Sequence, residues 1–416
     1  MADTNTFDVV VVGGGVIGCA AARSLAADHD VVVLEQGQIA AEASALAAGE
    51  ITMAPSYTDY PAVADHATEF FRAYDGTRQF AFEERPSLEL VKPGREELAG
   101  RRVDRLQGDG VAVEFLDAAT VEDRHPRFDM SSFGGAVRHE DTGFVDPYTF
   151  AVTLKRDAED RGATVHTDTA VTGFLVEDGA VAGVEADDGE TYRAPTVVVA
   201  AGWRTEALLR PLVQLPIQPY RTQIVVLEPD DPLDESFPMG WVPGEHVYFR
   251  PELNGDLLAG GFSFAEPDPE TASENEDEEF KMHVADLVPR FLHGFERAGF
   301  VNGWAGIDAA TPDTRPIIDA PDDAPDGLVV ATGFHGRGVM TAPVAATLVR
   351  ELVTGEDGTL PANRSRSTAS TRAPPTSSSS PSAPGTTTTT SSLFSRRCRC
   401  VRESYHGVRA VSRRTA

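Results

Sequence analysis

The sequence is poor in cysteine, in lysine and in long apolar runs. Its 416 residues include three Cys, and 36 Lys or Arg stand against 65 Asp or Glu. Three cysteines cannot form the disulfide network of small secreted domains, so nothing indicates an oxidising compartment. No stretch reaches the roughly 18 apolar residues that a spanning helix needs. These absences predict a cytoplasmic protein without a membrane span, long enough for two or three domains.

Acidic residues dominate the charge, with a formal net charge of −29 and only three lysines, Lys92, Lys155 and Lys281. A surface rich in acid and poor in Lys keeps a protein dispersed in concentrated salt, where repulsion is screened within roughly 3 Å. We therefore predict an acidic surface of the halophilic type, with an acidic partner-binding face as the alternative. Such a surface repels phosphates, so we expect no binding of nucleic acid.

Strand-like and helix-like stretches alternate through most of the chain, which is typical of an α/β protein. Residues 7–12 are apolar apart from Asp8 and follow Asp3 rather than basic residues, so we interpret them as a strand and not as a signal peptide. A small-residue helix at 16–27 and a second strand at 30–35 complete a βαβ unit. Residues 217–262 predict an antiparallel sheet with a turn at Asn254–Gly255. Further strands are predicted at 87–91, 170–175, 181–186, 196–200 and 327–332, and further helices at 62–74, 147–161, 278–292 and 339–353.

The composition changes after about residue 360. Residues 365–392 are nearly all Ser, Thr, Ala, Pro and Arg, and residues 361–416 contain ten Arg and one acid, Glu403. Such a composition cannot bury an apolar core, so we predict a disordered basic tail. The tail is either an interaction segment or an out-of-frame translation, and the nucleotide sequence of the gene would distinguish the two.

A glycine-rich turn follows the first predicted strand. It has the spacing G-x-G-x-x-G, and an acid ends the next strand. In this context the first glycine permits a tight turn, the second lets a pyrophosphate approach the backbone, and the third allows the helix to pack closely on the strand. The acid accepts hydrogen bonds from a ribose diol and disfavours the 2′-phosphate of NADP. The predicted contacts to the ADP half of a dinucleotide are Gly13, Gly15, Val16, Ile17, Gly18 and Glu35.

Two later strands also end in glycine turns, at residues 197–203 and 327–343. In the second, Gly333, Gly336 and Gly338 directly precede a helix, which favours an anionic ligand such as the pyrimidine end of a reduced flavin. No second complete G-x-G-x-x-G with its acid is found. The sequence therefore argues against separate FAD and NAD(P)H domains, although the first motif alone does not separate FAD from NAD.

These segments together resemble the FAD-dependent amine and amino-acid oxidoreductases of the D-amino-acid oxidase type, which oxidise glycine, sarcosine, dimethylglycine or proline. The resemblance covers roughly residues 6–355 and rests on segments 9–18, 35, 44–49, 197–203, 306–319 and 333–343. It implies a discontinuous Rossmann-like FAD-binding domain and a substrate domain whose antiparallel sheet covers the flavin. The implied FAD-binding parts are 6–85, 146–212 and 301–358, the substrate parts are 86–145 and 213–300, and the tail is 361–416.

The resemblance also implies which residues line the flavin. Residues 44–49 would follow the pyrophosphate and ribityl chain, and Val171 would lie on the adenine side. The turn after the third FAD strand, at residues 202–203, and the start of the last helix, at residues 336–340, would lie near the flavin ring. The implied contacts are Ser44, Ala48, Gly49, Val171, Gly202, Trp203, Gly336, Gly338, Val339 and Met340.

Three positions depart from the family pattern. Gly306 stands where monomeric sarcosine oxidases carry a flavin-tethering cysteine, so we expect non-covalent FAD. Asp308 stands where glycine oxidases carry a carboxylate-binding arginine, and Met340 where sarcosine oxidases carry a lysine. The usual carboxylate binders are therefore missing, and no metal site is predicted.

Other residues are candidates for the substrate. Tyr248 and Arg250 alternate with Phe249, so both face one side of a strand, where an arginine can hold a carboxylate through two parallel bonds. The alternative is an arginine paired with one of the many acids. His335 is a candidate proton relay beside Arg337. Second choices for the carboxylate are Arg221 and Arg337, and Tyr220 is a candidate for lining the pocket.

The resemblance implies oxidation of the C–N bond of a small amino acid or N-methylated amine. Hydride transfer to flavin N5 gives an imine that water hydrolyses, and no side-chain base is strictly required if the amine binds neutral. The electron acceptor is O2 or an electron carrier, and the lack of lysine in the flavin motifs favours the carrier. Two alternatives stay open: a flavin-binding assembly subunit without turnover, and an NAD-linked dehydrogenase.

Overall fold

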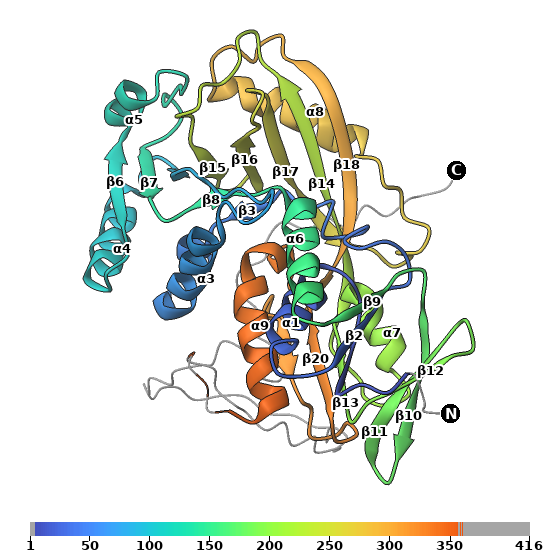
Figure 1. The fold of residues 1–416 in the computed structure, drawn as a ribbon. Helices are drawn as coiled ribbons and strands as arrows, with labels where there is room; N and C mark the ends of the chain where they lie inside the picture. Colours follow the sequence, from blue (N-terminus) through green and yellow to red (C-terminus); the bar gives the residue numbers. More distant parts are fainter. Residues whose placement is uncertain (1–4, 357, 359, 361–416) are drawn as a thin grey trace, which may run out of the picture.

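The computed structural model describes residues 5–356, 358 and 360, and the predicted tail at 361–416 lies outside this part. Two large sheets organise the chain (Figure 1). One has six strands in the order β19-β20-β13-β1-β2-β9, and the other has eight in the order β18-β14-β17-β16-β15-β5-β7-β6. The mixed α/β fold predicted from the sequence is confirmed.

The six-stranded sheet is built around β1, which pairs in parallel with β2 and β13. Its central strands are unbroken valine-rich runs that are buried along their whole length, as expected for strands covered on both faces. The edge strand β19 runs antiparallel to β20. The strands are β1 (Val9–Val12), β2 (Val31–Leu34), β9 (Thr164–His166), β13 (Thr196–Val199), β19 (Ile317–Asp319) and β20 (Leu328–Thr332).

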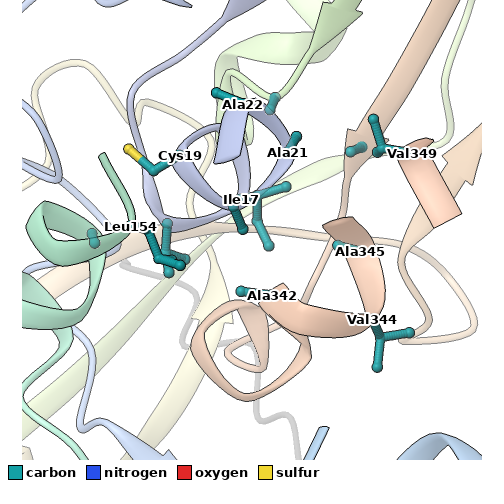
Figure 2. Packing of buried hydrophobic residues seen from close by; sticks show 14 of the residues in the cluster. Ile17, Cys19, Ala21, Ala22, Leu154, Ala342, Val344, Ala345 and Val349 are labelled. Atoms are coloured by element: carbon teal, nitrogen blue, oxygen red, sulfur yellow. The ribbon is translucent and has the colours of Figure 1, made fainter. Parts of the chain in front are cut away.

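Three helices, α1 (Val16–Leu25), α6 (Pro147–Asp160) and α9 (Gly338–Thr354), pack together beside this sheet (Figure 1). The buried core that α1 and α9 share contains small side chains, among them Ala21, Ala22, Ala342 and Ala345 (Figure 2). Because alanine adds only a methyl group, the two helices can approach closely and hold the starts of both helices in fixed positions. Helix α3 (Pro61–Tyr74) packs on the other side of α9.

The eight-stranded sheet confirms the antiparallel region predicted at 217–262. Its strands β14, β16 and β17 pair antiparallel, and the predicted turn at Asn254–Gly255 joins β16 to β17, with Gly255 at φ +88°. Helix α8 (Glu278–Leu287) packs on this sheet with a phenylalanine-rich core. The strands are β5 (Ser87–Val91), β6 (Val113–Asp117), β7 (Gly135–His139), β14 (Gln218–Glu228), β15 (Met239–Val242), β16 (Val247–Pro251), β17 (Leu257–Ala265) and β18 (Gly299–Ala310).

One predicted domain boundary falls inside a strand. The sequence interpretation began the last FAD-binding part at residue 301, but β18 pairs with β14 over its whole length. Residues 301–310 therefore belong to the eight-stranded sheet, because strand pairing, which the local sequence does not reveal, extends the sheet to Ala310. The other proposed boundaries stay predictions.

Several elements were not predicted from the sequence. Most of them are short or strongly charged, so their apolar periodicity is weak, and the 12-residue β18 lacks a clean alternation of apolar and polar residues. They are β3 (Glu50–Ile51), α2 (Met53–Ser56), β4 (Glu83–Glu84), α4 (Glu96–Gly108), α5 (Ala118–Arg124), β8 (Gly143–Phe144), β12 (Thr191–Arg193), α7 (Thr205–Leu209) and the strands β6, β7, β9, β15, β18 and β19. Strands β10 (Val171–Glu177) and β11 (Ala180–Ala186) form a separate small sheet with β12, as β3, β4 and β8 do. Within the described residues, no helix combines the length and apolar character that a membrane crossing requires.

Candidate functional site

Three glycine turns meet at one edge of the six-stranded sheet. Val12 pairs with Val199, and Val199 pairs with Val330, so β1, β13 and β20 end side by side in parallel. Each strand then continues into one of the turns singled out in the sequence. Ligands of open α/β sheets bind at the carboxyl ends of the strands, so this edge is the candidate site.

The turn between β1 and α1 depends on glycine at two of its positions. Gly13 has φ +106°, and a Cβ there would lie 2.5 Å from the Ala200 carbonyl oxygen. A Cβ on Gly18 would collide with the Gly13 carbonyl oxygen. At the start of α1, the Val16 N–H donates a 2.9 Å hydrogen bond to Ser44 Oγ. Ser44 is thus placed at the helix N-terminus, where an anion is stabilised.

Glu35 lies beside this turn. Its carboxylate accepts hydrogen bonds from the Gly14 N–H at 2.6 Å and the Gly37 N–H at 2.8 Å. The Glu35 carbonyl accepts from the Thr169 N–H at 2.9 Å, which brings the start of β10 at Val171 close to the end of β2. The predicted ribose-binding acid and the predicted adenine-side residue therefore lie in neighbouring segments.

The loop at 44–49 connects the two sheets. Trp304 on β18 donates from Nε1 to the Leu46 carbonyl at 2.9 Å, and Arg250 on β16 donates from Nε to the Ala48 carbonyl at 2.6 Å. Gly49 adopts φ +74°, and a Cβ there would collide with the Val145 carbonyl oxygen. The loop is therefore held in one conformation by both the eight-stranded sheet and the segment before α6.

Arg250 is 6% exposed and already has several partners. Besides the bond to Ala48, Nη1 donates to the Pro251 carbonyl, Nη2 lies 3.1 Å from Glu252 Oε1, and the guanidinium lies 4.7 Å from the centre of the Phe144 ring. Arg250 thus anchors the 44–49 loop, a role that the sequence reasoning did not foresee. Each of its nitrogens has a contact, yet a guanidinium has five N–H groups, so donors remain for a ligand.

Tyr248 shares the environment of Arg250, as the alternation with Phe249 predicted. Phe249 is buried in the core of the eight-stranded sheet, whereas Tyr248 packs with Ala48 and Trp304 on the opposite face. Burial raises the pKa of the Tyr248 phenol, and the nearby Glu50 carboxylate raises it further. Tyr248 is therefore a neutral hydrogen-bond group at any ordinary pH.

Glu50 is a residue that sequence reasoning missed. It follows Gly49 directly, and its Oε1 atom is buried without a hydrogen-bond partner. Burial raises the pKa of Glu50 to about 8, and Arg250 opposes this rise. An acid directly after the flavin-loop glycine was the available signal, but in a chain with 65 acidic residues it did not stand out.

The turn before α9 brings His335 close to Asp308 of β18. His335 has φ +51°, its ring lies 5.3 Å from the Tyr220 ring, and its Nδ1 is buried without a partner. Burial and, secondarily, Arg337 lower the pKa of His335, which favours the neutral ring. Asp308 on β18 accepts hydrogen bonds from the Gly336 and Ala309 N–H groups. Burial raises the pKa of Asp308, and these two bonds oppose the rise.

Two of the arginines predicted for the substrate are engaged elsewhere. Arg221 binds the Ser273 and Asn275 carbonyls and pairs with Asp277 at 3.1 Å, so it fastens the acidic loop before α8, and its second-choice substrate role stays a prediction. Arg337 donates to the Thr314 carbonyl at 3.1 Å. It caps the start of α9 and stays a candidate.

The remaining predicted flavin contacts lie around the same edge. Gly202 and Trp203 belong to a 3-10 turn after β13, and the Trp203 ring lies 4.0 Å from the Arg204 guanidinium carbon. Val339 and Met340, in the first turn of α9, have side chains buried in the core.

Comparison with known proteins decides the family. Residues 8–352 match the model of the DAO family, described as FAD-dependent oxidoreductases. The chain belongs to this family. It is therefore a flavoprotein oxidoreductase, and the alternative of an NAD-linked dehydrogenase is set aside.

Individual relatives agree in length and fold. The chain is similar to glycine oxidase of Pseudomonas putida, at 29% identity over 84% of this chain and 95% of the relative, and to glycine oxidase of Geobacillus kaustophilus, at 27% identity over 84% and 93%. It is also similar to the crystal structure of the Geobacillus kaustophilus enzyme, with a TM-score of 0.75 and 25% identity over 86% of this chain and 97% of that one.

The geometry fits the FAD that this family uses. Gly202 and Gly336 border open space, because a Cβ on either would meet nothing within 4 Å. The unpartnered Glu50 Oε1 and His335 Nδ1 are polar atoms that a ligand would satisfy. Gly13, Gly15 and Ser44 would hold the pyrophosphate at the start of α1, and the residues around Gly336 would lie near the ring.

The described residues offer no cysteine to tether the flavin. Cys19 is buried in α1, its Sγ donates to the Gly14 carbonyl at 3.4 Å, and burial raises the pKa of its thiol to about 12. At the position of the tethering cysteine, a Cβ on Gly306 would lie 3.1 Å from Leu46 Cβ. Across residues 5–356, 358 and 360, no group of three or more His, Cys, Asp or Glu is placed to hold a metal ion.

Proposed function

We propose that this flavoprotein oxidises the C–N bond of a small amino acid or N-methylated amine, using non-covalently bound FAD. When bound, FAD accepts the hydride that leaves the substrate's α-carbon. The observation that carries the proposal is the convergence of Arg250, Tyr248 and Glu50 beside the loop at Ala48, within a family member similar to glycine oxidases over most of its length.

The protein's own residues would bind and orient the substrate. Arg250 offers a fixed cation for a carboxylate, and its stacking on Phe144 and bond to Ala48 hold it in place. Tyr248 adds a neutral donor on the same face of β16. Asp308 replaces the family arginine near Gly336, so a carboxylate is disfavoured there. We infer that the substrate's carboxylate points toward β16 and away from the turn before α9.

His335 and Arg337 complete the proposed site from the other side. The neutral His335 ring, unpartnered at Nδ1, could relay a proton to solvent through the exposed Gly336 turn. Arg337 lies at the start of α9. Burial raises the pKa of the Tyr57 phenol, and Arg337 opposes this rise. These two roles support the proposal but do not choose between candidate substrates.

The proposal also covers the electron acceptor, the cellular compartment and the charge of the protein surface. We infer that electrons pass to a carrier more readily than to O2, because Lys92, Lys155 and Lys281 lie outside the flavin motifs. The excess of acidic residues supports a cytoplasmic protein adapted to high salt that does not bind nucleic acid.

An anaerobic visible spectrum in high salt tests the function. The flavin bands should bleach when the correct amine is added from a series of glycine, sarcosine, dimethylglycine, proline and D-amino acids. Bands that no amine bleaches would favour the second candidate, a flavin-binding assembly subunit without turnover, which the replacement of the family arginine by Asp308 supports. Absence of flavin bands after incubation with FAD would refute both.

A further inference from the structure

We propose that Glu50 accepts the proton that the substrate's ammonium group must lose before it can be oxidised. This inference rests on the proposed function and adds a catalytic residue to it. The amine must be neutral because the nitrogen lone pair forms the new C=N bond as hydride leaves. A base beside the bound ammonium group therefore removes the need for the rare neutral amine to be captured from solution.

The position of Glu50 in the fold places it at the site. It forms β3 with Ile51, directly after Gly49 of the loop that Arg250 holds. Across the small sheet Glu50 pairs with Phe144, and the Phe144 ring lies under the Arg250 guanidinium. Helix α9 packs against β3. Glu50 therefore lies on a strand that neighbours both the proposed carboxylate-binding arginine and the helix that begins at the glycine turn.

The carboxylate of Glu50 is prepared for a ligand. Its Oε1 atom is buried without a hydrogen-bond partner, while the residue as a whole is partly exposed. A buried carboxyl oxygen without a partner is costly, so a donor that arrives with the substrate would be favourable. An α-amino acid brings a carboxylate and an ammonium group one carbon apart, which matches Arg250 beside Glu50.

The charges around Glu50 set its ionisation. Arg250 and Tyr248 reach it from β16, and Arg250 is itself paired with Glu252. Strand β8 and helix α2 carry no titratable side chain, and Arg350 and Glu351 lie in the last two turns of α9. Burial dominates and raises the pKa of Glu50 to about 8. The group is therefore mostly protonated at neutral pH, and its capacity to accept a proton from the substrate grows as pH rises through about 8.

The step balances. An ammonium N–H bond breaks, the proton forms a bond to a Glu50 carboxylate oxygen, and the electron pair stays on nitrogen. The hydride then leaves the α-carbon with two electrons and reduces the FAD of the proposed function, while the nitrogen lone pair forms the C=N bond. Glu50 returns its proton to solvent after the imine leaves.

Infrared titration of Glu50→Gln against wild type measures the proposed group without any substrate. The wild-type holoenzyme should show a carboxylic-acid C=O stretch that disappears as pH rises through about 8, and Glu50→Gln should lack it. The matched control is Glu83→Gln, because Glu83 on β4 pairs with the same Phe144 on β8 and its side chain is 34% exposed. A wild type and Glu50→Gln with identical titrations would overturn the proposal.

Anaerobic flavin reduction tests the catalytic role. Glu50→Gln should reduce its flavin about 100-fold or more slowly and lose the rise in rate with pH, as expected when a general base is removed. Glu50→Asp, which keeps a carboxylate, should recover part of the rate and the pH dependence, and Glu83→Gln should match wild type. If wild type is reduced and Glu50→Gln equals it, this inference fails alone. If no amine reduces wild type, the proposed function fails and takes this inference with it.

Discussion

Replacing Gly18 by alanine tests whether the β1–α1 turn is held by close backbone packing. The added Cβ would collide with the Gly13 carbonyl oxygen and lie 3.0 Å from the Gly13 carbonyl carbon and 3.5 Å from Val11 Cγ1. The colliding atom belongs to the backbone of the turn and cannot rotate aside. The turn must therefore move, and with it the α1 N-terminus where the pyrophosphate is expected.

The magnitude follows from two opposing effects. Alanine in a helix is favoured over glycine by about 1 kcal/mol, whereas forced overpacking costs about 1–3 kcal/mol. Gly100→Ala in α4 is the matched control, because a Cβ there meets nothing within 4 Å. We expect Gly100→Ala to raise the free energy of unfolding by up to about 1 kcal/mol, and Gly18→Ala to lower it by up to about 2 kcal/mol, the overpacking cost less the helix-propensity gain.

Two measurements decide the outcome: denaturant unfolding of the apoprotein, and the FAD content of the protein after incubation with FAD, measured by absorbance. Gly18→Ala should unfold at lower denaturant than wild type and should retain little FAD, while Gly100→Ala should keep full FAD. If Gly18→Ala gained stability like Gly100→Ala and kept its FAD, the collision would not exist and the assignment of this turn to the pyrophosphate would be refuted.

Three further predictions concern charge and cofactor. The pKa of Glu50 is raised on folding from 4.5 to about 8, so between those values the folded state binds more protons than the unfolded state. The free energy of unfolding should therefore fall as pH rises through that window, by at most ~1.4 kcal/mol per pH unit. Equal pH slopes in urea unfolding of wild type and Glu50→Gln would contradict this. Acid denaturation should release all of the flavin into the supernatant, because Cys19 is buried in α1; yellow precipitate would show a covalent link. Arg250→Met should raise the apparent KM for a carboxylate substrate at least 10-fold and loosen the 44–49 loop toward protease cleavage, and unchanged kinetics with unchanged cleavage would remove Arg250 from the site.

The local sequence was sufficient for the elements with strong patterns. Valine runs predicted β1, β2 and β13, and the glycine spacing with Glu35 predicted the turn at the start of α1. The sequence could not predict β18 as part of the eight-stranded sheet, because Gly299–Ala310 lacks a clean alternation and gains its place only by pairing with β14. Helix α4 was not predicted because it is strongly charged and buries only Ala99, Val103 and Leu106, which gives a weak apolar period.

The sequence by itself determined the dinucleotide-binding fold and the positions of its glycine turns. The reason is that the backbone conformation of each turn depends on residues only a few places apart. Only the tertiary structure decided which charged groups meet. Arg221 and Arg250 both lie on predicted strands, and their sequence positions do not show that one fastens a surface loop while the other holds the Ala48 carbonyl beside Glu50. Burial and unpaired hydrogen-bonding atoms are properties of the packed chain, so a carboxylate such as Glu50 acquires its shifted pKa only when distant segments close around it.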